Sequence, residues 1–416
     1  MGERMPRVVV FSTLFPNPAQ PQAGVFIRER MFRVGQHLPL AVVAPVPWFP
    51  FQGILRCWRP HFRPEVPRRE VQSGVEVFHP RFFSVPGIFK RLDGFFLALG
   101  SLTTLGCLRR AGRLDVLDAH FGYPDGYAAT RLGRWLGVPV TITLRGTEMR
   151  HAATPGLGPR LVAALQGARR IFAVSASLKA VALALGIPET KVRVVGNGVD
   201  SAKFHPVPRS EARARLGLPA DVPVLITVGG LTERKGFHRV IELLPDLRQR
   251  FPGLRYLVVG GASAEGDWGP RLREQVRALG LEDAVQFLGP VAPEELKWVL
   301  GAASAFVLAT RNEGWANVIL EAMACGLPVV TTDVGGNREV VCRPELGSVV
   351  PFGDPETLKA ALTHALETDW SVATLTAHAR ANDWSLRVAD LLEEFRALAP
   401  ETATMKLDQG ELKTHG

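Results

Sequence analysis

Two glutamates separated by seven residues, Glu313 and Glu321, are the first residues of this sequence whose types and spacing suggest chemistry. The apolar run 304–309 before them predicts a buried strand, and residues 317–325 predict a helix. Glu313 is then expected in the loop after the strand, and Glu321 about one turn into the helix. The start of a helix presents free N–H groups that suit a diphosphate. Carboxylates on either side of it could bind the hydroxyl groups of a nucleotide sugar, although a solvated helix face would explain Glu321 equally well.

Composition places the chain among globular proteins of more than one domain. Its 416 residues exceed the usual size of one hydrophobic core, and 46% hydrophobic with 21% charged residues excludes a disordered chain. The four cysteines, Cys57, Cys107, Cys325 and Cys342, form no CxxC pair. This spacing predicts neither a zinc site nor a disulfide framework and fits a reducing cytoplasm.

The net charge of +9 favours anionic partners such as nucleotide phosphates, lipid phosphates or an anionic membrane surface. No recognition motif supports binding to nucleic acid. The N-terminal residues lack the apolar core of a signal peptide, so we expect none.

Short β-branched runs alternate with helical patterns along the first half of the chain. We predict strands at 7–12, 40–44, 75–78, 116–120, 140–144, 170–174 and 192–195. We predict helices at 26–37, 126–136, 158–167 and 177–185. Such alternation indicates βαβ units and a mostly parallel sheet.

The alternation pauses at residues 200–223, which are rich in proline and charge, and we expect the domain linker there. It then resumes, with predicted strands at 224–228, 256–259, 285–288, 305–309, 329–331 and 348–350. The sequence therefore predicts an α/β protein of two Rossmann-like domains that face each other across a cleft. Residues 386–398 predict a further helix near the C-terminus.

Two segments interrupt the pattern. Residues 45–67 carry five aromatic side chains, from Trp48 to Phe62, among prolines and arginines. Residues 95–108 form an apolar stretch that is too short to span a bilayer and has basic residues at both ends. Two interpretations remain open for this stretch: a helix that faces the core of the first domain, or an interfacial helix that dips into lipid headgroups.

A basic, glycine-rich stretch follows the first predicted strand of the second half. In Val228-Gly229-Gly230-Leu231-Thr232-Glu233-Arg234-Lys235-Gly236, the glycines allow the backbone to bend close to a ligand. Arg234 and Lys235 place two adjacent cations where a pyrophosphate could bind, although an exposed basic turn is the alternative.

Taken together, these motifs resemble the family-4 retaining glycosyltransferases of the GT-B fold, in particular the bacterial surface-polysaccharide branch with its teichuronic-acid-type enzymes. The resemblance rests on residues 229–236, on the pair Glu313 and Glu321, on residues 321–330 and 331–339, and on residues 197–200 with Phe204 in the first half. It implies an N-terminal acceptor-side domain at 1–200 and a C-terminal domain at 201–383 that binds the nucleotide sugar. A helix at 384–400 is then expected to pack back toward the N-terminal domain, followed by a flexible tail at 401–416.

The resemblance implies a role for individual residues of the second half. Arg234 and Lys235 would hold the donor diphosphate, Glu313 the donor sugar, and Glu321 the ribose. The remaining donor-binding positions that it implies are Gly230, the backbone N–H groups of Ala316, Asn317 and Val318, and a base pocket at Phe287 and Leu288.

In the first half, residues 22–26 resemble the family's glycine loop near the phosphate, with Gly24 as the donor-binding glycine and Ala23 in place of the usual second one. His120 falls where family members carry a catalytic histidine beside the reacting sugar; a core histidine is the alternative. Arg145 and Glu148 are implied on the acceptor side. Arg145 replaces the family's histidine and could bind a phosphate or an acidic acceptor, but it cannot act as a base.

The resemblance implies sugar transfer that needs no metal or other cofactor, because cations and helix N–H groups stabilise the leaving diphosphate. The expected substrates are a nucleoside-diphosphate sugar and a glycan or lipid-linked acceptor of polysaccharide biosynthesis. We expect the protein in the cytoplasm, with peripheral contact to the inner face of an anionic membrane. The alternatives are a catalytically silent subunit that binds sugar nucleotides, and a GT-B-like epimerase or phosphorylase.

Overall fold

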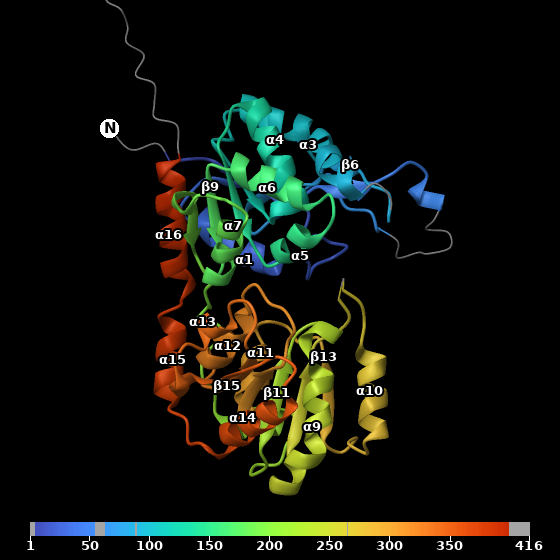
Figure 1. Cartoon of the computed structure of the whole chain (residues 1–416), viewed down its shortest axis with the longest axis vertical. Coiled ribbons are helices and arrows are strands. Elements are labelled where there is room, and N and C mark those ends of the chain that lie inside the picture. Colours follow the sequence, from blue (N-terminus) through green and yellow to red (C-terminus); the bar gives the residue numbers. More distant parts are fainter. Residues whose placement is uncertain (1–4, 55–62, 88–89, 264, 399–416) are drawn as a thin grey trace, which may run out of the picture.

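The computed structural model describes residues 5–54, 63–87, 90–263 and 265–398. Two α/β domains lie one above the other, and the helix nearest the C-terminus runs beside the upper, N-terminal domain (Figure 1). The expected flexible tail at 401–416, and Trp58 and Phe62 of the aromatic segment, lie outside the described residues.

The N-terminal domain is built on an eight-stranded sheet with the order β10-β9-β8-β7-β1-β2-β5-β4. Neighbouring strands are parallel except β4 and β5, which are antiparallel. Its strands are β1 (Val8–Phe11), β2 (Leu40–Val43), β4 (Arg69–Gln72), β5 (Val75–Phe78), β7 (Val116–His120), β8 (Val140–Leu144), β9 (Arg170–Ala173) and β10 (Val192–Val194). A separate parallel pair consists of β3 (Val46–Trp48) and β6 (Arg81–Phe83).

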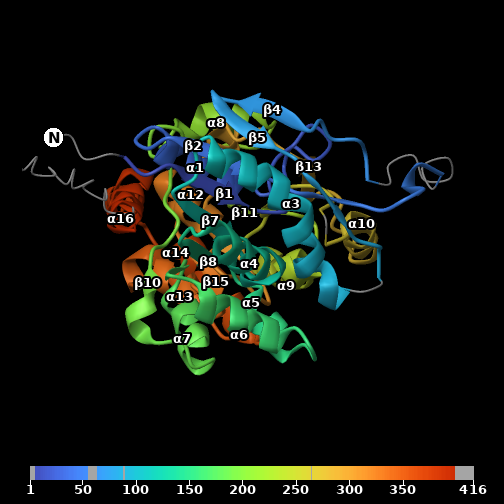
Figure 2. The ribbon, with the colours of Figure 1, turned by 90° about the horizontal axis from the view of Figure 1, so that it is seen from above.

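Alternate residues of a strand point to opposite faces of the sheet, so β1 contributes to two cores. Val9 and Phe11 belong to one cluster, and Val8 and Val10 belong to the other. The helices that cover this sheet are α1 (Val25–Gly35), α3 (Asp93–Arg110), α4 (Tyr127–Leu136), α5 (Glu148–Ala153), α6 (Gly158–Gly167) and α7 (Ala176–Ala184). Seen from above, α3 and α16 lie on opposite sides of the molecule (Figure 2).

The C-terminal domain has a six-stranded parallel sheet with the order β13-β12-β11-β14-β15-β16. Its strands are β11 (Val224–Val228), β12 (Arg255–Val259), β13 (Val285–Gly289), β14 (Ala305–Leu308), β15 (Val329–Thr332) and β16 (Gly347–Val350). Its helices are α8 (Arg209–Arg215), α9 (Phe237–Arg250), α10 (Gly269–Ala278), α11 (Leu296–Gly301), α12 (Asn317–Ala324), α13 (Asn337–Val340), α14 (Pro355–Glu367) and α15 (Val372–Arg380).

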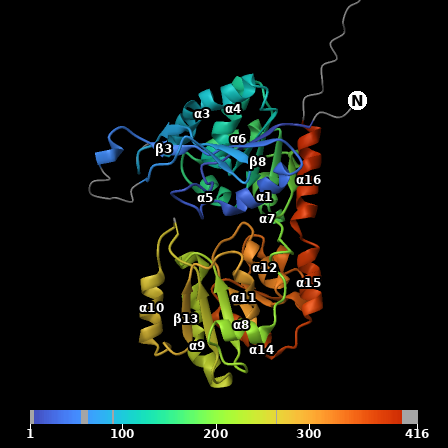
Figure 3. The same ribbon diagram turned by 180° about the vertical axis from the view of Figure 1, so that it is seen from behind.

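Helix α16 (Trp384–Ala397) follows α15 and extends along the side of the N-terminal domain, as the view from behind shows (Figure 3). Its apolar face, Val388, Leu391, Leu392 and Phe395, joins the core cluster that contains alternate residues of β1. Glu394 of α16 also binds Arg170 and Arg193 of the same domain. The last helix therefore ties the C-terminal part of the chain to the N-terminal domain.

Every strand predicted from the sequence is present, with bounds that differ by one or two residues, and so are the predicted helices. The strands β3, β4 and β6 were not predicted. The apolar stretch 95–108 lies in α3, which buries Leu97, Ala98 and Leu105 against the core. The core-facing interpretation is therefore correct for that face of α3. Among the described helices, none is both long enough and apolar enough to cross a membrane.

Candidate active site

The two cations of the glycine-rich stretch lie at the carboxyl end of β11. After β11 the chain turns through Gly229 and Gly230 into a short 3-10 helix, Glu233–Lys235, which carries Arg234 and Lys235. A Cβ atom on Gly236 would lie 1.9 Å from the carbonyl oxygen of Ala309, and its φ is +79°. Only glycine allows this close approach, which brings both cations beside the loop that follows β14.

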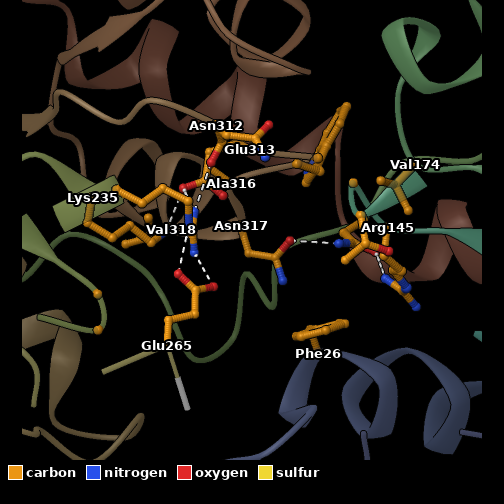
Figure 4. A pocket seen from close by; sticks show the side chains of 18 of the residues that line it. Phe26, Arg145, Val174, Lys235, Glu265, Asn312, Glu313, Ala316, Asn317 and Val318 are labelled. Carbon is orange, nitrogen blue, oxygen red and sulfur yellow. Dashed lines mark hydrogen bonds and ion pairs between the residues drawn. The ribbon is translucent and has the colours of Figure 1, made fainter. Parts of the chain in front are cut away.

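That loop supplies Glu313, which binds both cations through one oxygen. Glu313 Oε1 lies 2.7 Å from Lys235 Nζ and 3.0 Å from Arg234 Nη1. Arg234 also donates two hydrogen bonds of 2.9 Å to Glu265. Figure 4 shows Lys235, Glu265 and Glu313 on one side of the pocket. Lys235 and Arg234 are thus held in place before any ligand binds.

Helix α12 begins directly after the same loop. Ala316 precedes it in an extended conformation, and within the described residues no side chain caps the helix. The first N–H groups of α12 are therefore free to meet an anion. Ala316, Asn317 and Val318 all line the cavity.

Glu321 lies one turn into α12 and also lines the cavity, half-buried. Burial raises the pKa of its carboxyl group to about 7, although the charge of Lys203 acts in the opposite direction. Glu313 and Glu321 therefore lie in the same cavity as the cations and the helix start, as the sequence predicts.

Arg145 contributes the N-terminal domain's wall of the cavity. Its Nη1 donates to Asn197 Oδ1 at 2.9 Å, and its guanidinium lies 5.0 Å from the ring centre of Phe26. Asn197 in turn donates to Asn317 Oδ1 of α12 at 2.8 Å. Arg145 and Asn197 thus connect the wall of one domain to the helix start of the other.

His120 does not reach the cavity. It is fully buried, with Nδ1 3.0 Å from Arg145 Nη2 and Nε2 3.3 Å from Asp118 Oδ2. Burial lowers its pKa to about 4, although Asp118 acts in the opposite direction, so the imidazole is neutral at pH 7. Because Arg145 can only donate, Nδ1 accepts and Nε2 carries the proton. The structure therefore places His120 beside Arg145 and outside the cavity, and its role beside the reacting sugar stays a prediction.

Four other expected positions also lie outside the cavity. Glu148 is buried and accepts hydrogen bonds from the backbone N–H groups of Gly122, Arg145 and Gly146, so it shapes the loop rather than facing an acceptor. Gly24, at φ +68°, precedes α1 and packs against Leu14. Phe287 and Leu288 belong to the edge strand β13, where Arg273 covers the ring of Phe287.

The cavity itself has a volume of about 610 Å³ and is lined by both domains. Pockets of this size hold ligands as large as a nucleotide sugar. Of the expected positions it brings together Arg145, Gly230, Arg234, Lys235, Glu313, Ala316, Asn317, Val318 and Glu321.

The cavity also contains residues that sequence reasoning did not assign to the site. Arg150 and Glu265 add charged groups to its lining, and Trp315 and Phe26 supply apolar surface. Asn197 could have been found, because it belongs to the quoted stretch 197–200. Glu265 sits in a loop of unremarkable composition, so only the fold brings it beside Arg234.

Comparison with known families agrees with this geometry. Residues 208–382 match the model of glycosyl transferases group 1, and residues 56–203 match glycosyltransferase family 4. A D-inositol 3-phosphate glycosyltransferase of Thermobispora bispora is 32% identical over 359 residues, which span 79% of this chain and 82% of the relative. The chain belongs to the glycosyltransferases that combine a family 4 domain with a group 1 domain. The corresponding protein of Acidothermus cellulolyticus is 30% identical over 315 residues, or 71% of this chain and 70% of the relative.

Solved structures confirm that this glycosyltransferase has the GT-B fold. The sucrose-phosphate synthase of Thermosynechococcus elongatus superimposes with a TM-score of 0.72 at 20% identity, covering 95% of this chain and 99% of that chain. HepE of Anabaena, solved in complex with UDP, gives a TM-score of 0.71 at 19% identity and covers 94% and 100% of the two chains. The relatives named above do not single out the teichuronic-acid-type branch.

Proposed function

We propose that this glycosyltransferase moves a sugar from a nucleoside-diphosphate sugar to an acceptor hydroxyl, with retention at the anomeric carbon and without a metal. One observation carries the proposal: a single interdomain cavity contains two preorganised cations, an uncapped helix start and two carboxylates. This set matches the charges and hydroxyl groups of a sugar nucleotide.

In the proposed complex the diphosphate lies between Lys235 and Arg234 on one side and the first N–H groups of α12 on the other. Glu321 accepts hydrogen bonds from the ribose, and Glu313 from the donor sugar. For the base, uracil is the first candidate, because HepE, which shares the fold, was solved with UDP.

In the proposed reaction the bond between the anomeric carbon and the diphosphate oxygen breaks, and the acceptor oxygen forms a bond on the same face of the sugar. The departing phosphate takes the proton of the acceptor hydroxyl. Lys235, Arg234 and the N–H groups of α12 stabilise the negative charge that develops on the diphosphate. His120, held between Asp118 and Arg145, contributes by orienting Arg145.

For the acceptor we propose a molecule that carries a phosphate. Arg145 and Arg150 supply cations from the N-terminal domain to the cavity, and guanidinium groups bind phosphate well. A lipid-linked glycan of polysaccharide biosynthesis meets this requirement. A small phosphorylated polyol also meets this requirement. It is the second candidate acceptor, because the named relatives are D-inositol 3-phosphate glycosyltransferases.

The deciding experiment is a thermal-shift panel of nucleotides and nucleotide sugars, followed by release of free nucleotide with and without acceptor. A ligand that binds only the folded state raises the melting temperature. The proposal expects one nucleotide sugar both to stabilise the protein and to release its nucleotide faster when an acceptor is present. Binding without any release would identify a silent subunit, and turnover of the sugar without transfer would favour an epimerase or phosphorylase.

We also propose that the protein works in the cytoplasm and touches the inner face of the membrane through α3. Leu92, Phe95 and Leu99 follow a helical spacing and remain exposed, next to Lys90 and Arg91 at the start of the helix. Flotation with anionic vesicles at low salt tests this. The wild type should float, and Phe95→Glu should not; a wild-type protein that stays in the pellet contradicts the proposal.

A further inference from the structure

Glu339 reaches from the C-terminal domain to the N-terminal domain outside the cavity. It lies in the short helix α13, and its carboxylate accepts hydrogen bonds from Ala176 N at 2.7 Å and Ser177 N at 3.1 Å. Both donors belong to the first turn of α7. Glu339 is part of the stretch 331–339 that carried the family resemblance, and the proposed reaction gives it no role.

The first turn of α7 has unpaired N–H groups that this carboxylate satisfies. A helix leaves its first N–H groups without partners inside the helix. Ser175 caps one of them, since its side chain accepts from Leu178 N at 3.3 Å. Glu339 accepts hydrogen bonds from the N–H groups of Ala176 and Ser177. Its negative charge also interacts favourably with the positive end of the helix dipole. The contact is therefore a charge-assisted bond between the two domains.

The backbone around Glu339 packs directly against the loop that carries Glu313. A Cβ atom on Gly335 would lie 1.7 Å from the carbonyl oxygen of Glu313. One on Gly336 would lie 2.8 Å from the carbonyl oxygen of Gly314 and 3.0 Å from Cβ of Ser175. A movement of α13 relative to α7 would therefore shift the loop that carries Glu313.

Other contacts between the domains lie in the same region. A Cβ atom on Gly314 would lie 2.1 Å from the carbonyl oxygen of Arg145, so the two loops touch through their backbones. Trp315 packs against a core cluster of each domain. These two contacts bring the walls of the cavity together by packing, and the hydrogen bond from Asn197 to Asn317 adds a polar contact between neutral side chains.

We propose that Glu339 is a positioning residue: an interdomain latch that holds the two domains in the arrangement that aligns Arg145 with Glu313 and Lys235. It does not touch the cavity. Only the kinetic consequence rests on the proposed transfer function; the effect on domain arrangement does not.

The chain offers two ways to break the latch and a matched control. Glu339→Ala removes the acceptor. Ala176→Pro removes one donor and keeps α7, because the first helical position favours proline and Ser175 before it is already extended at φ −152° and ψ 158°. Arg338→Ala is the control, since Arg338 lies in the same short helix but pairs with the exposed Asp333 at 2.6 Å.

Hydrogen exchange and small-angle X-ray scattering of the full chain, without donor or acceptor, test the latch directly. Glu339→Ala should raise the exchange rate of the Ala176 and Ser177 amides roughly tenfold or more and increase the radius of gyration. Ala176→Pro should give part of the same increase in radius, and the double variant should add nothing to Glu339→Ala. Arg338→Ala should match the wild type.

The kinetic readout separates a latch from a merely structural residue. The turnover number should fall roughly tenfold in Glu339→Ala, whereas the affinity for nucleoside diphosphate should stay within about threefold of wild type. An unchanged exchange rate and radius in Glu339→Ala overturn the latch. If that variant does not fold, the same unchanged radius in Ala176→Pro overturns it. If the wild type transfers no sugar, the proposed function fails while the scattering and exchange results still decide the latch.

Discussion

The raised pKa of Glu321 makes donor binding dependent on pH. Its carboxyl group titrates at about 7 because burial disfavours the charged form. The ionised form is the stronger acceptor for ribose hydroxyls, since hydrogen bonds to a charged group are roughly twice as strong as neutral ones. Affinity for the donor should therefore increase as the pH rises through 7.

The size of the effect follows from the fraction ionised. With a pKa of about 7, roughly a tenth of Glu321 is ionised at pH 6 and roughly nine-tenths at pH 8. If only the carboxylate binds ribose, the dissociation constant should fall about tenfold between these pH values. Isothermal titration with an intact nucleotide sugar measures this, because its diphosphate does not titrate in the range.

The variant Glu321→Gln provides the control. It should bind the donor more weakly than the wild type at pH 8, and its dissociation constant should not change with pH near 7. Asp125, which is buried and bonds to Ser12 and Thr13, also has a pKa of about 7, and this variant leaves it in place. If the dissociation constant of Glu321→Gln still changes with pH near 7, the titrating group is Asp125 rather than Glu321. A wild-type dissociation constant that does not change between pH 6 and pH 8 would refute the reasoning.

The pH dependence of folding stability gives a second test of the raised pKa of Glu321. A glutamate whose pKa is raised on folding binds more protons in the folded state, so its contribution to stability is lost as the pH rises from its unfolded pKa toward 7. Glu321→Gln should therefore raise the melting temperature relative to wild type more at pH 8 than at pH 5. The reverse order would show that the carboxylate is stabilised where it lies.

Other variants test the remaining parts of the cavity. Lys235→Ala and Glu313→Ala should each lower the turnover number by about 10²-fold, comparable to the loss of one oxyanion donor; near-normal steady-state rates would remove that residue from the site. Arg145→Ala should raise the KM of a phosphorylated acceptor roughly tenfold and leave the KM of the donor nearly unchanged, and a change confined to the donor would contradict its proposed role. Gly314→Ala would place a Cβ atom 2.1 Å from the carbonyl oxygen of Arg145, and a misfit of this kind can cost roughly 10²-fold in rate. Gly106→Ala, whose Cβ would meet nothing within 4 Å, is its control.

The fold could be predicted because its long strands are continuous apolar runs. Strands of parallel sheets are buried on both faces, so segments such as 8–11 and 305–308 stand out in the sequence. The strands β3 and β6 have only three residues each, and Pro47 lies inside the first. Nothing in such short segments distinguishes a strand from a loop.

The C-terminal wall of the site was predictable for a related reason. The carboxyl ends of parallel strands meet at one edge of a sheet, so loops after β11 and β14 must be neighbours. The placement of His120 at a strand end followed the same logic, but sequence cannot tell which neighbours cover a side chain. Arg145 lies over His120 and excludes it from the cavity. Phe287 lies outside the cavity on the edge strand β13, and that edge position depends on the strand order, which the sequence does not state.

The charges of the cavity link ligand binding to the position of the domains. Glu313 and Glu265 both pair with Arg234, and Glu313 also binds Lys235, so two carboxylates balance these two cations in formal charge. Arg150, from the N-terminal domain, also lines the cavity. Its charge helps to lower the pKa of the Glu265 carboxyl group, although the hydrogen bond from Arg234 is the largest cause. A diphosphate bound at Lys235 and Arg234 would add net negative charge and attract Arg150, a cation that the N-terminal domain brings to the cavity. Its binding and the contact made by Glu339 favour the same arrangement. Linkage then requires each to strengthen the other, and the expected effect on affinity stays within about threefold.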